Sequence, residues 1–202
     1  YQVHFPHEEV ATEETMAALN ELIKSGKVRY IGCSNYKVWH MVQSQHAAIN
    51  KGFAKFISSQ PPYSLIDRRV EKEHLPACKE YGIGIIPYSP LASGFLTGKY
   101  RNNKLPENSR QKLFGDYYTR YSKPNSSIVI EEYLKIAKKF NLDFAQMSLK
   151  FCEIQPFMAS VIIGATTMEQ LKTNIESVNV NLSEEIIKEI NEVQKINPNP
   201  CP

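Results

Sequence analysis

Short apolar segments typical of buried strands alternate with helix-like segments along this chain. The expected strands are residues 1–5, 28–31, 53–58, 83–87 and 159–164. The expected helices are residues 12–25, 36–50, 69–81 and 127–140, followed by one from residue 143 to near 156, one that begins at 167 and one that begins at 183. Strands that alternate with helices imply a parallel α/β sheet, either doubly wound or part of an eight-stranded barrel.

The last three helices carry sequence patterns typical of helix starts. Asp143 and Thr167 each stand three residues before a glutamine, Gln146 and Gln170, which is the spacing of a capping box. Ser183 is the expected N-cap of the final helix. The helix after Thr167 carries an apolar stripe of Met168, Leu171, Ile175 and Val178.

Composition narrows the class of protein. With 202 residues and 42% hydrophobic content, the chain can build one substantial core. Its 24 basic and 21 acidic residues are spread along the sequence, which argues against a nucleic-acid partner. No apolar run reaches the roughly 20 residues of a membrane span. The four cysteines form no CxxC pair, so we expect no zinc site and no disulfide framework, but reduced thiols in a cytoplasmic protein.

The stretch from Gly82 to Lys99 predicts a binding loop. An apolar strand runs directly into small residues, a tyrosine at position 88 and a lysine at position 99. Small residues let backbone N–H groups approach an anion closely, and binding groups gather at the carboxyl ends of parallel strands. Residues 101–125 then break the repeat, and we expect a loop insertion that covers a ligand.

Four local sequences together resemble the aldo-keto reductase family of (β/α)8 barrels. They are Val3-His4-Phe5-Pro6, the stretch GKVRYIGCSN at 26–35, Pro87-Tyr88-Ser89-Pro90-Leu91, and GATTMEQLKTNI at 164–175. Residues 157–177 are especially similar to the bacterial Tas-type reductases of this family. The resemblance implies that residues 1–202 are the C-terminal portion of a single barrel domain and supply about its last five strands. The chain opens without a methionine inside an expected strand, so we expect a fragment, with the family's catalytic Asp, Tyr and Lys upstream of Tyr1.

His4, Ser34 and Asn35 each allow a structural and a functional interpretation. A single histidine near aromatic residues is more often structural, but the resemblance makes His4 the catalytic histidine, which donates a hydrogen bond to the substrate oxygen. Ser34 and Asn35 are residue types that favour turns and helix caps without any ligand. The resemblance implies that they and Gln60 hold the nicotinamide carboxamide, because an amide ligand needs both a donor and an acceptor.

The remaining candidates surround the rest of a nicotinamide cofactor. Tyr88 is either a core aromatic residue or, as the resemblance implies, the ring that stacks on the nicotinamide. The resemblance places the following residues near the phosphates: Ser89, Pro90, Leu91, Ser93, Lys99 and Arg110. It places Gly164, Thr166, Gln170 and Asn174 at the adenosine end, beside a helix N-terminus.

The resemblance implies hydride transfer from NADPH to an aldehyde or ketone, without a metal ion. Thr166, Thr167 and Thr173 depart from residues common in the family around the 2′-phosphate, so NAD is not excluded. Without the upstream Asp, Tyr and Lys, we expect the polypeptide as given to be inactive. The alternative is a regulatory or sensor subunit that binds the cofactor without turnover, as the potassium-channel β subunits of this family do. The sequence leaves the substrate and the oligomeric state open.

Overall fold

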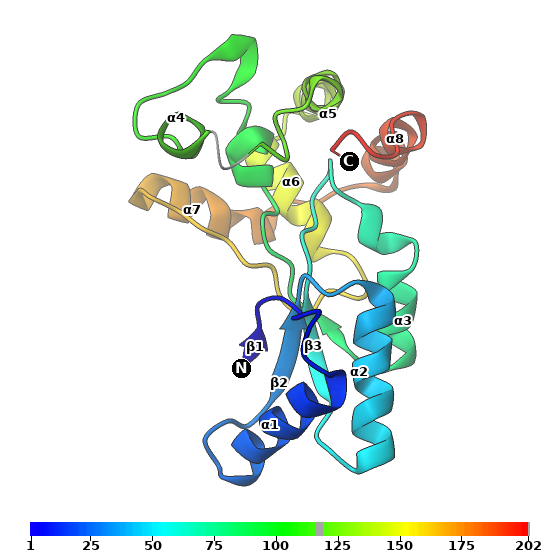
Figure 1. Ribbon diagram of the computed structural model, residues 1–202. Coiled ribbons are helices and arrows are strands. Elements are labelled where there is room, and N and C mark those ends of the chain that lie inside the picture. Colours follow the sequence, from blue (N-terminus) through cyan, green and yellow to red (C-terminus); the bar gives the residue numbers. More distant parts are fainter. Residues whose placement is uncertain (116–118, 202) are drawn as a thin grey trace. The chain divides into compact units, whose positions relative to one another are not determined.

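The computed structural model describes residues 1–115 and 119–201, and within them the chain forms two compact units (Figure 1). The first unit comprises Tyr1–Pro62, Val70–Pro87 and Phe157–Ser160. The second comprises Tyr63–Arg69, Tyr88–Pro156 and Val161–Pro202. Part of the expected 101–125 insertion, residues 116–118, lies outside the described residues. That all of residues 1–202 belong to one barrel domain stays a prediction.

The first unit is built on a parallel sheet of four strands in the order β1-β2-β3-β4. The strands are β1 Gln2–Val3, β2 Ile31–Ser34, β3 Phe56–Gln60 and β4 Gly84–Ile85. Each strand pairs in parallel with its neighbour in the sequence. The expected parallel α/β arrangement is therefore confirmed for the first four strands.

Three helices of this unit pack on the sheet. They are α1 Thr12–Lys24, α2 Val38–Lys51 and α3 His74–Glu80. Met16 of α1 and Met41 of α2 are fully buried in one hydrophobic core with Ile31, Phe56 and Ile85 of the strands. The expected helices 12–25 and 36–50 are thus confirmed.

β2, β3 and β4 begin later than expected. The backbone N–H groups of Val28, Phe53 and Ile83 each donate to a carbonyl near the end of the preceding helix. These apolar residues therefore belong to the turns that end the helices, as in Schellman-type motifs, and the strands begin after them.

The expected helix 69–81 is wrong in its first part. Residues Arg69–Glu71 form a short 3-10 helix, η1, and α3 begins only at His74. Pro76 is the physical reason, because a proline inside a longer helix would remove a backbone hydrogen bond and clash with the preceding turn. A helix that begins at His74 places Pro76 in its first turn, where the missing N–H costs nothing.

The expected fifth strand at 159–164 is also wrong. Met158 makes an isolated parallel bridge with Ile85, and the N–H of Ala159 donates to the carbonyl of Ile85 at 2.8 Å. Beyond this point the described chain has no ladder, because β4 is only two residues long and offers no further pairing. Ile162 and Ile163 accordingly remain 40% and 38% exposed.

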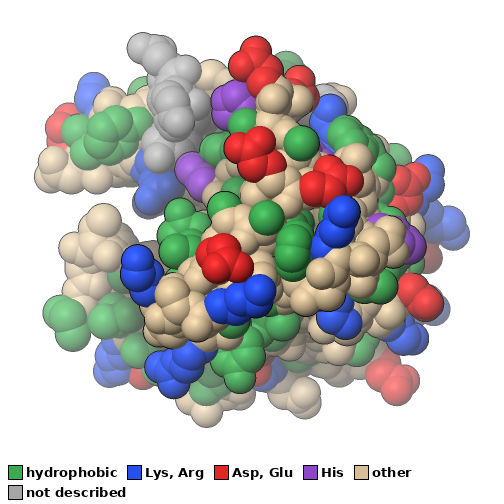
Figure 2. Space-filling view, turned by 60° about the horizontal axis from the view of Figure 1, so that its bottom comes forward, with side chains coloured by type: hydrophobic (Ala, Val, Ile, Leu, Met, Phe, Trp, Pro, Cys, Tyr) green, Lys and Arg blue, Asp and Glu red, His purple; other side chains and the backbone are tan. Residues whose placement is uncertain are grey.

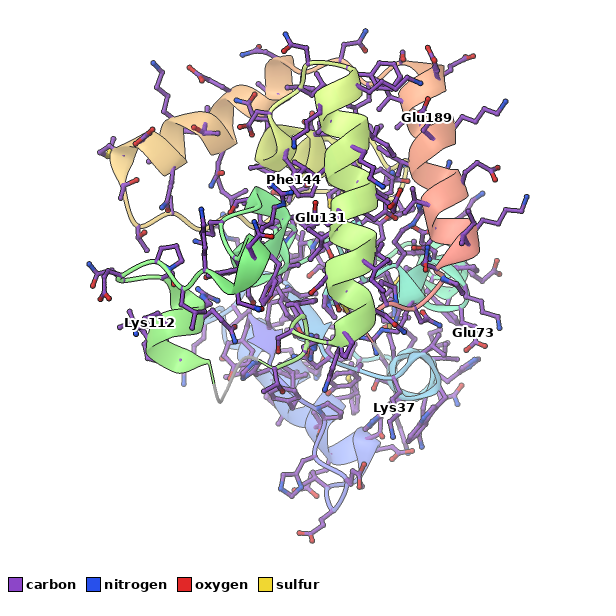
Figure 3. All side chains as sticks on the ribbon, turned by 90° about the horizontal axis from the view of Figure 1, so that it is seen from above. Lys37, Glu73, Lys112, Glu131, Phe144 and Glu189 are labelled. Atoms are coloured by element: carbon purple, nitrogen blue, oxygen red, sulfur yellow. The ribbon has the colours of Figure 1, made fainter. Side chains whose placement is uncertain are left out.

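The second unit is mainly helical. Its helices are η2 Ala92–Thr97, η3 Arg101–Asn103, α4 Arg110–Phe114, α5 Pro124–Lys139, α6 Phe144–Glu153, α7 Met168–Glu176, η4 Ser177–Asn179 and α8 Glu184–Ile196. α5 packs against α6 and α8, and α6 packs against α7 and η2. In Figure 3, Glu131 on α5 and Glu189 on α8 mark two helices that lie side by side; these carboxylates pair with Arg101 and Lys139.

The expected N-caps are confirmed. The side chains of Asp143, Thr167 and Ser183 accept hydrogen bonds from the third backbone N–H of their helices. In a full capping box, the glutamine side chain would accept a hydrogen bond from the backbone N–H of the N-cap residue. Here the two glutamines bind other groups: the Gln146 amide donates to the Thr173 carbonyl, and Gln170 Oε1 accepts from the Thr166 N–H. The apolar stripe after Thr167 is not a buried face in this chain, since Met168, Ile175 and Val178 are 78%, 55% and 56% exposed.

On the face shown in Figure 2, acidic and basic side chains are interspersed among hydrophobic ones. This matches the even spread of charge along the sequence. None of the helices in the described part of the chain is long and apolar enough to cross a membrane.

Candidate functional site

Four predicted residues of the first unit come together at the carboxyl ends of neighbouring strands. Ser34 ends β2 and Gln60 ends β3, and the two are register partners in the sheet. The Ser34 hydroxyl donates to the Gln60 carbonyl at 2.8 Å. The Asn35 amide nitrogen donates to Ser34 Oγ at 3.0 Å and to the backbone carbonyl of His4 at 2.9 Å. One chain of hydrogen bonds therefore joins the ends of three adjacent strands.

The solvent exposure of these four side chains indicates which of them can contact a ligand. Ser34 is 2% exposed, so its hydroxyl serves the network. Asn35 and Gln60 are half-buried, and His4 is exposed, with its ring centroid 4.3 Å from that of Phe5. An exposed imidazole with half-exposed amides beside it can bind a ligand that presents a carbonyl oxygen and a carboxamide.

Tyr88 belongs to the second unit and is half-buried. Its backbone carbonyl accepts from the Tyr63 N–H at 3.3 Å, and its hydroxyl accepts from Arg120 Nη1 at 3.2 Å. A purely core tyrosine would be fully buried, as Tyr63 is at 0% exposed. The partial exposure of Tyr88 leaves part of its surface available to a ligand.

The loop after Tyr88 has an unusual backbone. Ser89, Ala92, Ser93 and Gly94 all have positive φ, between 47° and 95°. A Cβ atom added to Gly94 would lie 2.9 Å from Lys99 Cε and 3.1 Å from Lys99 Nζ, so the lysine side chain covers this glycine. Among the described residues, no carboxylate lies within 4 Å of that ammonium group. A turned backbone beside an unpaired cation suits an anionic group such as phosphate.

The other phosphate candidates lie in the same unit. Pro90 is buried, whereas Leu91, Ser93 and Lys99 are half-buried. Arg110 is exposed at the first position of α4, where Ser109 caps the helix by accepting from the Lys112 N–H.

The four adenosine-end candidates form a local cluster around the start of α7. The N–H and hydroxyl of Thr166 both donate to Gln170 Oε1, at 3.0 and 3.1 Å. The Asn174 amide donates to the Gly164 carbonyl at 3.2 Å, and Asn174 is 6% exposed. These contacts order the loop before α7, and Thr166 and Gln170 remain exposed beside the helix N-terminus.

Arg120 was missed by the sequence interpretation. It contacts Tyr88 across a separation of 32 residues, and no local periodicity or spacing points to such a contact. Tyr121 beside it is 3% exposed, and Asp67 is 2% exposed and paired with Arg69.

Within residues 1–115 and 119–201, no three His, Cys, Asp or Glu side chains form a cluster that could hold a metal ion.

Comparison with known proteins identifies relatives over the whole chain. The model of the aldo/keto reductase family matches residues 1–195. Protein tas of Escherichia coli (strain K12) is 37% identical over 219 residues, which cover 100% of this chain and 63% of that protein. Versiconal hemiacetal acetate reductase of Aspergillus parasiticus is 33% identical over 95% of this chain and 55% of its own length. A putative voltage-gated potassium channel subunit beta of Schizosaccharomyces pombe is 32% identical over 96% of this chain and 58% of its own length. The chain thus spans between 55% and 63% of the length of these relatives.

Proposed function

This chain belongs to the aldo/keto reductase family of oxidoreductases, and we propose that it is the C-terminal portion of an NADPH-dependent carbonyl reductase. Membership of this family implies a (β/α)8 barrel, to which the parallel strands of the first unit would contribute. The observation that carries the proposal is the hydrogen-bonded group of His4, Ser34, Asn35 and Gln60 at the carboxyl ends of adjacent strands. Barrel enzymes build their active sites at this end of the strands.

His4 is the proposed catalytic residue of this chain. Its imidazole donates a hydrogen bond to the carbonyl oxygen of an aldehyde or ketone. Negative charge develops on that oxygen during reduction, so the hydrogen bond strengthens in the transition state. The bond from Asn35 to the His4 backbone holds this residue at the strand end.

The chemistry of these side chains suits a nicotinamide dinucleotide. In the proposal, Asn35 and Gln60, with Ser34 bonded to Asn35, would hold the carboxamide, and Tyr88 would stack on the nicotinamide ring. Lys99 and the turned backbone near Gly94 would bind the pyrophosphate, together with Ser89, Pro90, Leu91, Ser93 and Arg110. Gly164, Thr166, Gln170 and Asn174 would bind the adenosine end, with NADP preferred to NAD. When bound, this cofactor supplies the hydride.

The proton donor lies outside this chain in the proposal. A segment before Tyr1 contributes the family's catalytic Asp, Tyr and Lys, and the chain's coverage of only 63% of protein tas supports this. General acid catalysis contributes roughly 10²- to 10⁴-fold to a rate, so the isolated chain is expected to lack reductase activity. The four buried free cysteines fit a reduced, cytoplasmic environment.

A second function is supported by the similarity to the putative channel subunit beta. In that alternative, the protein binds the cofactor as a sensor or regulatory subunit and does not reduce carbonyl compounds at a significant rate.

The test uses the full-length protein, with NADPH and NADH titrations and turnover of a panel of aldehydes and ketones. We expect His4→Ala to lower kcat by about 10²- to 10³-fold, the usual cost of one oxyanion donor, with little change in NADPH affinity. His7→Ala is the matched control, because His7 is exposed in the same loop. Cofactor binding without turnover would support the sensor alternative, and failure to bind either cofactor would contradict both functions.

A further inference from the structure

Tyr88 is held at both ends by contacts within the second unit. Its backbone carbonyl accepts from the Tyr63 N–H, and its phenol oxygen accepts from Arg120 Nη1 at 3.2 Å. The ring between these two anchors is half-buried. A tyrosine side chain has two rotatable torsions, and a hydrogen bond at its tip restricts where the ring lies.

Arg120 is itself placed by an aromatic neighbour. Its guanidinium carbon lies 6.0 Å from the ring centroid of Tyr121, at the outer range of a cation–π contact. Tyr121 is 3% exposed, so its ring is fixed in the interior of the second unit. The buried Tyr121 ring therefore acts as a fixed surface beneath the guanidinium.

Among the described residues, no carboxylate forms an ion pair with Arg120. The nearby acidic side chain, Asp67, is paired with Arg69 through two hydrogen bonds of 2.8 and 3.0 Å. Burial would lower the pKa of Arg120, but the hydrogen bond that Arg120 donates to Tyr88 and the electrostatic interactions with the Tyr88 and Tyr121 phenols outweigh burial and raise this pKa. Arg120 therefore stays charged and keeps its donor directed at Tyr88.

We propose that Arg120 is a positioning residue, which fixes the Tyr88 ring so that one face is ready to stack on the nicotinamide ring. The inference rests on the proposed function, because it requires that Tyr88 stacks on the cofactor. A ring held in place before the cofactor arrives loses less freedom on binding, so the anchored tyrosine binds more tightly than a mobile one. Arg120 acts only through Tyr88 and does not contact the cofactor.

A double-mutant cycle in the full-length protein tests this inference. Arg120→Met removes the donor but keeps an unbranched stem beside Tyr121, and Tyr88→Phe removes the acceptor but keeps the ring. We expect each single change to weaken NADPH binding by about 2- to 10-fold, the range of one net hydrogen bond. The double variant should bind no more weakly than either single variant, because both changes remove the same bond.

Arg120→Lys adds a rescue experiment. A lysine retains a donor and the charge, so it should restore part of the affinity when Tyr88 is present and none in the Tyr88→Phe background. Arg101→Met is the matched control, because Arg101 lies in the same unit and pairs with Glu131 through hydrogen bonds of 2.5 and 2.7 Å. Its NADPH affinity should stay within about twofold of wild type, since surface changes of this kind usually have small effects.

The possible results distinguish a failure of the role inferred for Arg120 from a failure of the proposed cofactor binding. Additive losses, or rescue by Arg120→Lys in the Tyr88→Phe background, would mean that Arg120 contacts the cofactor itself and would overturn the inference. A lower melting temperature of the cofactor-free Arg120→Met protein with unchanged NADPH affinity would also overturn it, because the role would then be structural. If the wild-type protein binds neither NADPH nor NADH, the proposed function itself is wrong.

Discussion

The buried side chain of Gln45 gives the sharpest stability prediction. Gln45 lies on α2 and is 0% exposed. Its amide nitrogen donates to the Phe56 carbonyl at 3.0 Å, and its amide oxygen accepts from the Phe56 N–H at 3.0 Å. Phe56 begins β3 where the register with β2 shifts, between Ile31 and Gly32. The glutamine therefore completes the backbone pairing at an irregular point of the sheet.

Gln45→Leu keeps a similar volume and removes both hydrogen bonds. Each buried backbone group left without a partner costs about 1 to 3 kcal/mol, so the free energy of unfolding should fall by about 2 to 6 kcal/mol. For a chain of this size, each kcal/mol corresponds to about 2 to 4 °C, so the melting temperature should fall by about 4 to 24 °C. Thermal and urea unfolding of the full-length protein, followed by circular dichroism, measures both quantities.

Gln43→Leu is the matched control, because Gln43 lies on the same helix and is exposed. It should change the stability by no more than about 0.5 kcal/mol. Equal effects of the two substitutions, or a loss below about 1 kcal/mol for Gln45→Leu, would refute the hydrogen-bond argument.

The dependence of the stability of Gln45→Glu on pH tests the same pair of hydrogen bonds. The new carboxyl group must be protonated to donate to the Phe56 carbonyl, and burial also disfavours its charge, so its folded pKa is raised above the unfolded value of about 4.3. A raised folded pKa means that the stability is present below the unfolded pKa and is lost as the pH rises through the folded pKa. The difference in stability from wild type should therefore grow with pH, whereas Gln43→Glu should show no such trend.

Three further predictions concern buried groups. Burial raises the pKa of Cys33 and of Cys78 to about 12, so iodoacetamide at pH 8 should label neither in the folded protein and both after unfolding in urea. Burial lowers the pKa of His74, so stability should fall as the pH drops below the unfolded value of about 6.5, and His74→Gln should reduce that loss in urea titrations. In Gly32→Ala, the new methyl group would meet the Ser58 hydroxyl and the Gln2 amide and displace the hydrogen bond between them, so we expect a loss of about 1 kcal/mol in the same assay.

The sequence predicts the first four strands and their order because periodicity and helix caps are local properties. The strand boundaries depend on bonds that periodicity does not reveal, such as the one from the Val28 N–H back to the end of α1. Pro76 is a local signal that limits the helix expected at 69–81, because a helix tolerates proline only in its first turn. The segment 159–164 has the composition of a strand, but a strand also needs a partner, and β4 is too short to provide one.

For the candidate site, too, the sequence predicts what depends on local signals and misses what depends on the folded structure. His4, Ser34 and Gln60 could be placed together from sequence, because the carboxyl ends of adjacent parallel strands meet at one edge. Their connection through the Asn35 amide could not, since it depends on side-chain torsions. The contact between Arg120 and Tyr88 depends on the path of the loop between them, which carries no periodic pattern.

Backbone conformation supplies an independent reason to look at the loop after Tyr88. Among the described residues, every residue with positive φ outside this loop is either a glycine or an asparagine, the two types that tolerate the left-handed region best. Inside the loop, Ser89, Ala92 and Ser93 adopt φ values of 58°, 47° and 57°. Glycine would adopt these angles without strain, so the other side chains persist there at a cost of order 1 kcal/mol each. Strained backbone of this kind clusters at catalytic and ligand-binding sites, and here it lies beside the ammonium group of Lys99. The backbone therefore gives independent support to the proposal that this loop binds phosphate.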